Sequence, residues 1–348
     1  LSTGLIYVPG TYAKTEEISG MAQVASKYNG VYASHIRNEG DFVTEAINEA
    51  VLIGKLADIP VQISHFKVTY KPNHGRSAYT IAQVEAARSE GIDVTIDQYP
   101  YTASSTNLGV RLPDWALSGG QDSLKQRIAD PATHKRIIEG MLDQLKQYKY
   151  KDYYFAVVAQ HQADTSLNGK SIKEINILKG RKDRPKEQAE TILDMMNAGG
   201  AQMVYHGMSE DDVKYFMKYP FNMVGADGGV VETGKGMPHP RSYGTNARVL
   251  GKYVREEQVV PLEEALRRMT SLPARKFNLH DRGLLLPGMA ADIVVFDDKT
   301  VSDKATFEQP HQFSVGFRYV IVNGTVTVEE GKHTGARAGT ILYGPGKK

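Results

Sequence analysis

The segments VYASHIRNEGD (residues 31–41) and VQISHFK (residues 61–67) share one pattern, thirty positions apart. Each is an apolar stretch typical of a strand that ends in a histidine, with a basic residue two places further on. One strand and its following helix together take about 30 residues. His35 and His65 therefore occupy the same place in two successive strand-and-helix units.

The first hundred residues extend this pattern in both directions. We expect strands at residues 4–7, 31–35, 61–65 and 94–99, with helices of the amphipathic type between them. Strands that alternate with helices predict a parallel sheet, either open or closed into a barrel.

A long insert interrupts the pattern, and a β-rich region ends the chain. The insert covers about residues 112–200 and contains one strand candidate at 154–160. The strand-and-helix pattern resumes with MVYHGM (203–208) and FNMVGADGG (221–229). From residue 284 on, short apolar runs and an Asn-Gly turn predict antiparallel strands. We therefore expect a barrel domain at 1–282 and part of a small β domain at 283–348.

The composition is that of an ordinary globular protein. The chain has 348 residues, of which 41% are hydrophobic and 24% are charged, and its net charge is +2. This balance gives no sign of a nucleic-acid partner, and no apolar run approaches the roughly 20 residues that span a membrane. The absence of cysteine excludes disulfides and thiol nucleophiles from this chain. We expect a cytoplasmic location, with a periplasmic one left open, and an N-terminal portion that precedes Leu1.

Three residues at predicted strand ends suggest a metal site. His35, His65 and Asp227 lie where parallel α/β folds carry their active-site groups. Two neutral imidazoles and a carboxylate suit a zinc-type ion, which lowers the pKa of its bound water to about 7. The alternative is structural, since a strand-end histidine often only forms hydrogen bonds and an aspartate before two glycines is typical of a turn. The residues alone leave both interpretations open.

Several longer motifs resemble one enzyme family in the expected order. They are GLIYVPGTYA, SHIRNEGD, VQISHFK, DQYPYTASST, GADGG with PHPRSYGT, MTSLPARKFNL and LPGMAADIVVFD. Together they resemble the D-aminoacylase or N-acyl-D-amino-acid deacylase family of the amidohydrolase superfamily. The resemblance implies an α/β fold, a (β/α)8 TIM-type metallo-hydrolase barrel with a small β-sandwich appendage. Barrel strands one to three and the family's HxH motif should lie before Leu1, so we expect an incomplete barrel that a missing segment or a second chain would complete.

The resemblance implies metal and catalytic roles for the three strand-end residues. His35 and His65 resemble the histidine ligands of a site that binds one or two Zn²⁺ ions. Asp227 resembles the aspartate that contacts the metal site, takes a proton from water and delivers it to the leaving amine.

Three further residues resemble the family's substrate-binding groups. Lys67, Tyr99 and Arg241 match the residues that surround the carboxylate of the N-acyl amino acid, with Tyr101 as a less favoured alternative to Tyr99. A guanidinium can hold a carboxylate through two hydrogen bonds, and an ammonium and a phenol add charge and direction. These residue types therefore suit an anionic substrate.

The implied function is zinc-dependent hydrolysis of the amide bond of N-acyl-D-amino acids to a carboxylate and a free D-amino acid. The substrate would be a small molecule with a free carboxylate, and we expect neither a nucleic-acid nor a membrane partner. One alternative keeps the fold and changes the bond: a cyclic amidohydrolase of the dihydroorotase or hydantoinase kind, or a dipeptidase. Another is an inactive fragment that lacks half of the metal site.

Overall fold

Five parallel strands form the sheet that carries the candidate site. The computed structural model describes residues 1–347, and its parallel sheet has the order β1-β2-β3-β4-β8. The strands are β1 (Ser2–Gly4), β2 (Tyr32–His35), β3 (Val61–Ile63), β4 (Val94–Gln98) and β8 (Asn222–Val224). The predicted parallel sheet is confirmed. It is an open sheet, because within residues 1–347 β1 and β8 are its two edges.

The first strand lies earlier than the expected residues 4–7. Only Ser2–Gly4 pair with β2. The Leu5 N–H still donates to the His35 carbonyl oxygen at 3.0 Å, and beyond Leu5 the chain leaves the sheet. Gly10 returns so close to Gly4 that a Cβ on Gly10 would lie 2.7 Å from the Gly4 carbonyl oxygen. The apolar run after Gly4 is therefore part of a turn. Hydrophobicity alone could not distinguish this turn from a strand.

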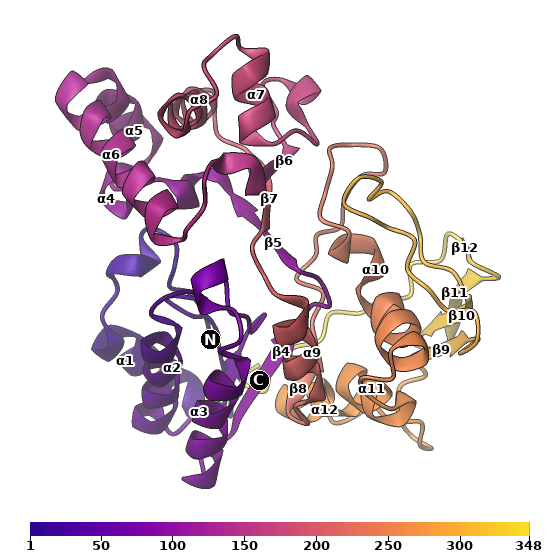
Figure 1. The fold of residues 1–348 in the computed structure, drawn as a ribbon. Helices are drawn as coiled ribbons and strands as arrows, with labels where there is room; N and C mark the ends of the chain where they lie inside the picture. Colours follow the sequence, from indigo (N-terminus) through magenta and orange to yellow (C-terminus); the bar gives the residue numbers. More distant parts are fainter. Residues whose placement is uncertain (348) are drawn as a thin grey trace.

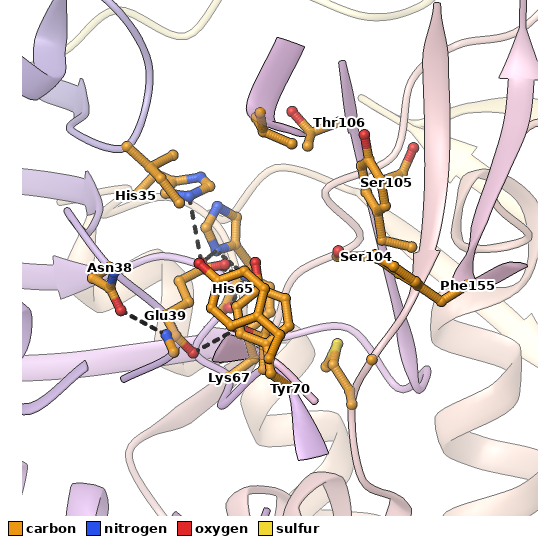
Figure 2. Close-up of a pocket in the computed structure, with 18 of the residues that line it drawn as sticks. His35, Asn38, Glu39, His65, Lys67, Tyr70, Ser104, Ser105, Thr106 and Phe155 are labelled. Carbon is orange, nitrogen blue, oxygen red and sulfur yellow. Dashed lines mark hydrogen bonds and ion pairs between the residues drawn. The ribbon is translucent and has the colours of Figure 1, made fainter. Parts of the chain in front are cut away.

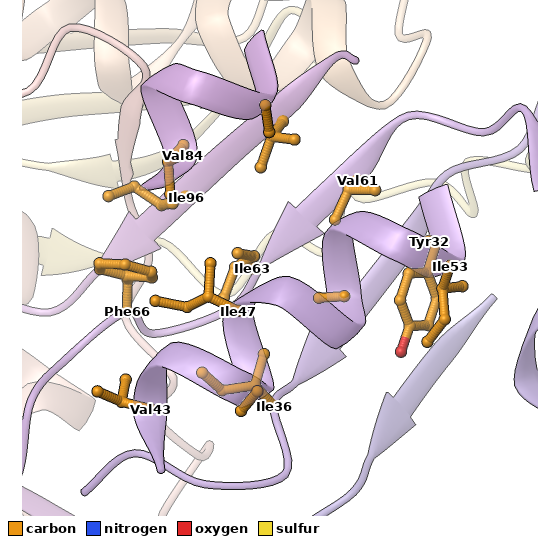
Figure 3. Packing of buried hydrophobic residues seen from close by; sticks show 14 of the residues in the cluster. Tyr32, Ile36, Val43, Ile47, Ile53, Val61, Ile63, Phe66, Val84 and Ile96 are labelled. Atoms are coloured by element: carbon orange, nitrogen blue, oxygen red, sulfur yellow. The ribbon is translucent and has the colours of Figure 1, made fainter. Parts of the chain in front are cut away.

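Helices lie against the sheet (Figure 1), and apolar side chains of the helices and strands form one buried cluster. The helices are α1 (Thr15–Ser26), α2 (Val43–Ala57), α3 (Ser77–Ser89) and α9 (Glu210–Lys218). Val43, Ile47 and Ile53 recur along α2 at a spacing that puts them on one face of the helix. They are fully buried in one cluster with Val61 and Ile63 of β3 (Figure 3). This packing fixes α2 against the sheet and so fixes the strand ends that carry the site.

The insert extends beyond the expected residues 112–200: residues 103–206 build an antiparallel sheet with helices α4 to α8 around it. Its strands are β5 (Ala103–Asn107), β6 (Ala156–Gln160) and β7 (Gln202–His206), in the order β5-β7-β6. Its helices are α4 (Asp114–Leu117), α5 (Gly120–Ala129), α6 (Pro131–Gln147), α7 (Ile172–Leu178) and α8 (Pro185–Asn197). The strand expected at 154–160 is confirmed as β6.

The expectation that MVYHGM resumes the parallel pattern is wrong. This segment forms β7, which pairs antiparallel with β5 on one side and with β6 on the other. Both edges of β7 are therefore hydrogen-bonded to strands of the insert's own sheet. Its partner β5 has the sequence ASSTN, and small polar residues of this kind give little strand signal.

The C-terminal part consists of a helical stretch and an antiparallel sheet. The helices are α10 (Arg241–Arg248), the π-helix η6 (Val249–Glu256), α11 (Leu262–Met269) and α12 (Ser271–Lys276). The strands are β9 (Ile293–Phe296), β10 (Phe317–Val322), β11 (Thr325–Glu329) and β12 (Lys332–His333), and each neighbouring pair is antiparallel, as predicted.

Short 3-10 helices connect several of these elements. They are η1 (Gly10–Tyr12), η2 (Lys71–Asn73), η3 (Leu108–Arg111), η4 (Tyr153–Phe155) and η5 (Thr165–Leu167). Of the helices formed by residues 1–347, none combines the length and the apolar character needed to cross a bilayer.

Gly54 tests the contact between α2 and the sheet. A Cβ at this position would lie 2.3 Å from Val61 Cγ2 and 3.3 Å from the Ile59 carbonyl oxygen. Val61 is fully buried and its β-branched side chain is stiff, so it cannot easily move away. Gly54→Ala should therefore lower the free energy of unfolding, measured by urea denaturation, by about 1–3 kcal/mol.

Gly20→Ala in α1 is the matched control. Gly20 is exposed, and apart from its chain neighbours and the backbone of its own helix no atom of residues 1–347 lies within 4 Å of a Cβ built on it. Alanine should raise the free energy of unfolding by up to about 1 kcal/mol, the ordinary helix preference over glycine. If both substitutions changed stability equally, the described packing of α2 on β3 would be wrong.

Candidate active site

One cavity brings together all six residues selected from the sequence. Its lining includes His35, His65, Lys67, Tyr99, Asp227 and Arg241. Five of them lie at or just after the carboxyl ends of β2, β3, β4 and β8, and the sixth begins α10. The cavity therefore lies at the edge of the sheet where parallel α/β enzymes carry their active sites. Figure 2 shows part of its wall.

The two histidines form a compact group with Glu39 (Figure 2). One potential ligand atom from each of His35, Glu39 and His65 lies within 4.8 Å of the others. The imidazole centroids are 4.2 Å apart. Oε1 of Glu39 lies 3.5 Å from His35 Nε2 and 3.1 Å from His65 Nδ1. Sequence reasoning missed Glu39, although its position four residues after His35 in SHIRNEG was a signal that could have found it.

An unusual backbone conformation aims His65 into this group. His65 has a φ of +40°, a conformation that costs free energy for a residue other than glycine. The turn is held by Asp97 of β4, which accepts a hydrogen bond from the His65 N–H at 2.7 Å and another from Gln62 Nε2 at 2.6 Å. The neighbouring strand therefore orients this imidazole.

The local electrostatics favour neutral imidazole at His35 and an ionised Glu39. Burial lowers the pKa of His35 to about 3. Burial opposes ionisation of Glu39, but Lys67 and the two histidines outweigh it and hold the pKa of Glu39 below its usual value. Lys67 Nζ donates to Glu39 Oε1 at 2.5 Å and to the His65 carbonyl oxygen at 2.7 Å.

These residues fit a zinc-type ion. The Nε2 atom of His35 is buried and has no hydrogen-bond partner among residues 1–347, so its lone pair is free for another partner. Two imidazole nitrogens and a carboxylate oxygen are a frequent protein ligand set for such an ion. A buried, unpaired imidazole nitrogen otherwise costs free energy, and a bound cation would remove that cost.

Asp227 lies in the same cavity but outside the three-residue group. Its backbone φ is +47°, and its Oδ2 lies 2.9 Å from Arg241 Nη1. A Cβ on the next residue, Gly228, would lie 2.9 Å from Ser242 Cα, so this glycine allows the close approach of α10. The side chain of Asp227 remains 40% exposed, facing the open part of the cavity. Its assignment as a metal ligand and proton carrier stays a prediction.

The two predicted substrate-binding cations both lie near the Tyr99 ring. The Arg241 guanidinium carbon is 4.6 Å and Lys67 Nζ is 5.6 Å from the centroid of the Tyr99 ring. Burial raises the pKa of Tyr99 well above its ordinary value, so the phenol keeps its proton. The alternative residue Tyr101 points elsewhere, with its hydroxyl donating to the Pro240 carbonyl oxygen at 3.5 Å. This geometry supports the choice of Tyr99 over Tyr101.

Comparisons with known proteins find similarity to amidohydrolases. Residues 236–328 match the Amidohydrolase family. The chain is 35% identical to the D-aminoacylase of Alcaligenes xylosoxydans xylosoxydans over 342 residues, 98% of this chain and 60% of that protein. It is 36% identical to the N-acyl-D-glutamate deacylase of the same organism over 323 residues, 93% of this chain and 56% of that protein.

A solved structure extends the similarity to the fold. The N-acyl-D-glutamate deacylase from Bordetella bronchiseptica, complexed with zinc and a phosphonate inhibitor, matches with a TM-score of 0.76 and 35% identity, covering 94% of this chain and 59% of that one. The resemblance inferred from the motifs and the α/β barrel-type fold with a separate antiparallel sheet are thereby confirmed. The chain spans about 60% of the length of the curated relatives that it matches.

Metal titration tests the histidine group. We expect the chain to bind Zn²⁺ in isothermal titration calorimetry, and His65→Asn should weaken this binding by at least about 100-fold. The reason is that loss of a residue that merely supports a ligand already costs about 10–100-fold in affinity. His35→Asn should weaken binding similarly.

His280→Asn is the control for this titration. His280 is exposed and lies outside the cavity lining, so its replacement should leave the affinity unchanged. Equal Zn²⁺ affinity of all three variants would show that the ion binds elsewhere.

Proposed function

We propose that this chain carries the catalytic site of a metal-dependent amidohydrolase that cleaves N-acyl-D-amino acids into a carboxylate and a free D-amino acid. One observation carries the proposal: two imidazoles with centroids 4.2 Å apart lie in the same cavity as Lys67, Arg241 and Asp227. The similarity to a D-aminoacylase and to an N-acyl-D-glutamate deacylase supports the N-acyl amide as the bond cleaved and the D configuration of the amino acid.

His35 and His65 would hold the metal ion, with Glu39 and Asp227 as the carboxylates in reach of the site. When bound, a zinc ion supplies positive charge that polarises the amide carbonyl and makes water a better nucleophile. The low pKa of His35 keeps this imidazole unprotonated, which a metal ligand requires. The zinc-complexed relative supports the choice of metal.

The cations of the cavity would bind the substrate carboxylate. Arg241 is only 7% exposed and its guanidinium lies against the Tyr99 ring, so its orientation is fixed before substrate arrives. A fixed planar guanidinium can donate two parallel hydrogen bonds to a carboxylate. Lys67, with its Nζ 5.6 Å from the centroid of the Tyr99 ring, adds positive charge.

Asp227 would move the proton of the reaction. Its carboxylate accepts a proton from the attacking water and delivers it to the nitrogen of the scissile amide, which then leaves as an amine. The ion pair with Arg241 holds Asp227 beside the place where the substrate carboxylate would bind. Proton transfer and carboxylate binding are therefore adjacent in space.

The alternatives have less support. Among the curated proteins, cyclic amidohydrolases match this chain only over short segments, the longer being 38% identity to a dihydroorotase over 65 residues. Lys67 and Arg241 also favour a substrate with a free carboxylate, which a simple cyclic diamide lacks. The inactive-fragment hypothesis would require that no metal binds. The cytoplasmic location stays a prediction.

Asp227→Asn tests the proton-transfer role. Asparagine keeps the shape of the side chain but cannot accept the proton, so kcat for N-acetyl-D-methionine should fall by about 10²–10⁴-fold. Release of acetate is the readout. Asp211→Asn, an exposed position in the first turn of α9, is the matched control and should keep kcat. Full activity of the Asp227 variant would end the proposed role.

Arg241→Met tests recognition of the substrate carboxylate. The unsubstituted chain should prefer N-acetyl-D-methionine over its primary amide by about 100-fold in kcat/KM, since the neutral amide cannot accept two charge-assisted hydrogen bonds from Arg241 as a carboxylate can. The variant should lose most of this preference. An unchanged preference would place the substrate carboxylate elsewhere.

A further inference from the structure

His239 is a buried histidine that the proposed reaction does not use. It lies in the motif PHPRSYGT, two residues before Arg241, and it is only 3% exposed. Three aromatic rings pack edge-on against its imidazole, at centroid distances of 5.9 Å for Tyr99, 5.2 Å for Tyr101 and 5.1 Å for Phe307. These contacts hold the imidazole in one orientation.

Both nitrogens of this imidazole have a backbone partner. Nδ1 accepts a hydrogen bond from the Arg241 N–H at 3.1 Å, and Nε2 lies 2.9 Å from the Ala103 carbonyl oxygen. A backbone N–H can only donate and a carbonyl oxygen can only accept, so these partners assign the ring proton to Nε2. Burial and the nearby charge of Arg241 lower the pKa of His239 well below its ordinary value. The ring is therefore neutral, with an acceptor toward Arg241 and a donor toward Ala103.

The bond to Nδ1 fixes the start of α10. Arg241 is the first residue of this helix, and the first N–H groups of a helix have no partner within it. Pro240 precedes Arg241, and its ring offers no acceptor for such an N–H group. His239 supplies the acceptor instead, and so holds the backbone of Arg241 in place.

The strand β5 holds Arg241 at a second point. The Ser105 carbonyl oxygen accepts a hydrogen bond from Arg241 Nη2 at 3.3 Å. Ser105 and Ala103 both belong to β5, which is an edge strand of the insert's sheet. The edge of the insert therefore contacts the guanidinium of Arg241 directly and its backbone through His239.

We propose that His239 is a positioning residue, whose Nδ1 sets the direction from which the Arg241 guanidinium meets the substrate carboxylate. This inference rests on the proposed function, in which Arg241 binds that carboxylate. The insert then contributes to substrate recognition through the backbone of β5. Because a displacement of about 1 Å in a group that orients the substrate can cost about 10²-fold in rate, one hydrogen bond behind the guanidinium can control the preference for an anion.

Two substitutions separate the two hydrogen bonds of His239. Glutamine places its amide nitrogen as many bonds from Cβ as Nε2, so it keeps the donor to Ala103 and loses the acceptor for the Arg241 N–H. His239→Gln should therefore lower the ratio of kcat/KM for N-acetyl-D-methionine to that for its primary amide by about 10-fold, chiefly by raising KM for the acid.

Asparagine retains the other hydrogen bond. It places its carbonyl oxygen as many bonds from Cβ as Nδ1, and an asparagine side chain readily accepts from the N–H two residues further on. His239→Asn should therefore keep the acid-to-amide ratio within about 3-fold of the unsubstituted chain.

His134→Gln is the matched control. The ring of His134 in α6 also makes two hydrogen bonds, with the Ile128 carbonyl oxygen at 3.0 Å and with Glu190 at 2.9 Å. His134 lies outside the cavity lining. The acid-to-amide ratio of this variant should not change.

The tautomer of His239 gives a second test, which does not require the variants to fold. ¹⁵N NMR of the imidazole in the unsubstituted chain should show an unprotonated Nδ1 and a protonated Nε2. A protonated Nδ1 cannot accept from the Arg241 N–H and would overturn the inference.

The outcomes separate this inference from the proposed function. A purely structural role for His239 would lower kcat/KM for both substrates alike, so an unchanged ratio in His239→Gln overturns the inference. An equal loss of the ratio in His239→Gln and His239→Asn also overturns it, because asparagine keeps the acceptor. Absence of hydrolysis of N-acetyl-D-methionine by the zinc-loaded unsubstituted chain contradicts the proposed function instead, and the tautomer still tests His239.

Discussion

The site depends on one buried carboxylate that organises the groups around it. Glu39 accepts a hydrogen bond from Lys67 and lies within 3.5 Å of a nitrogen from each of His35 and His65. Because burial makes protonated imidazole unfavourable at His35, the positive charge near Glu39 resides on Lys67. The His35 imidazole is thus left neutral, with an unpaired lone pair on Nε2. Removing Glu39 would leave a buried ammonium unpaired beside the candidate metal ligands.

Strained backbone recurs around this cavity. His65, Tyr70 and Asp227 all have positive φ values without being glycine, and all three line the same cavity. Each such residue costs of order 1–3 kcal/mol. The surrounding structure offsets this cost, since the strands below are locked by fully buried side chains such as Ile63 and Ile96. The rigid sheet therefore supports strained backbone at three residues whose side chains line the cavity.

Part of this arrangement could be predicted from the sequence. Repeated units with histidines at equivalent positions predicted the parallel sheet and placed His35 and His65 at the same edge, because the carboxyl ends of parallel strands meet there. Motifs selected Lys67 and Arg241, which the structure brings into one cavity with the histidines. These features could be predicted because each depends on a short segment of the sequence.

Other features depend on contacts between residues far apart in the sequence and could not be predicted from it. β5 and β7 are about one hundred positions apart, and the polar sequence of β5 gives no sign of its partner. Arg111 looks like an ordinary surface arginine until aromatic residues from three other segments enclose it. The role of Glu39 in the site becomes visible only from its contact with Lys67, which lies 28 positions away in the sequence.

A crystal structure of the zinc-loaded chain, with anomalous scattering recorded at the zinc edge, tests most directly whether His35 and His65 hold the metal. We expect an anomalous peak about 2.0–2.1 Å from one nitrogen each of His35 and His65, inside the cavity that also contains Arg241 and Asp227. A peak bound to other residues, with His35 and His65 free of metal, would contradict this expectation.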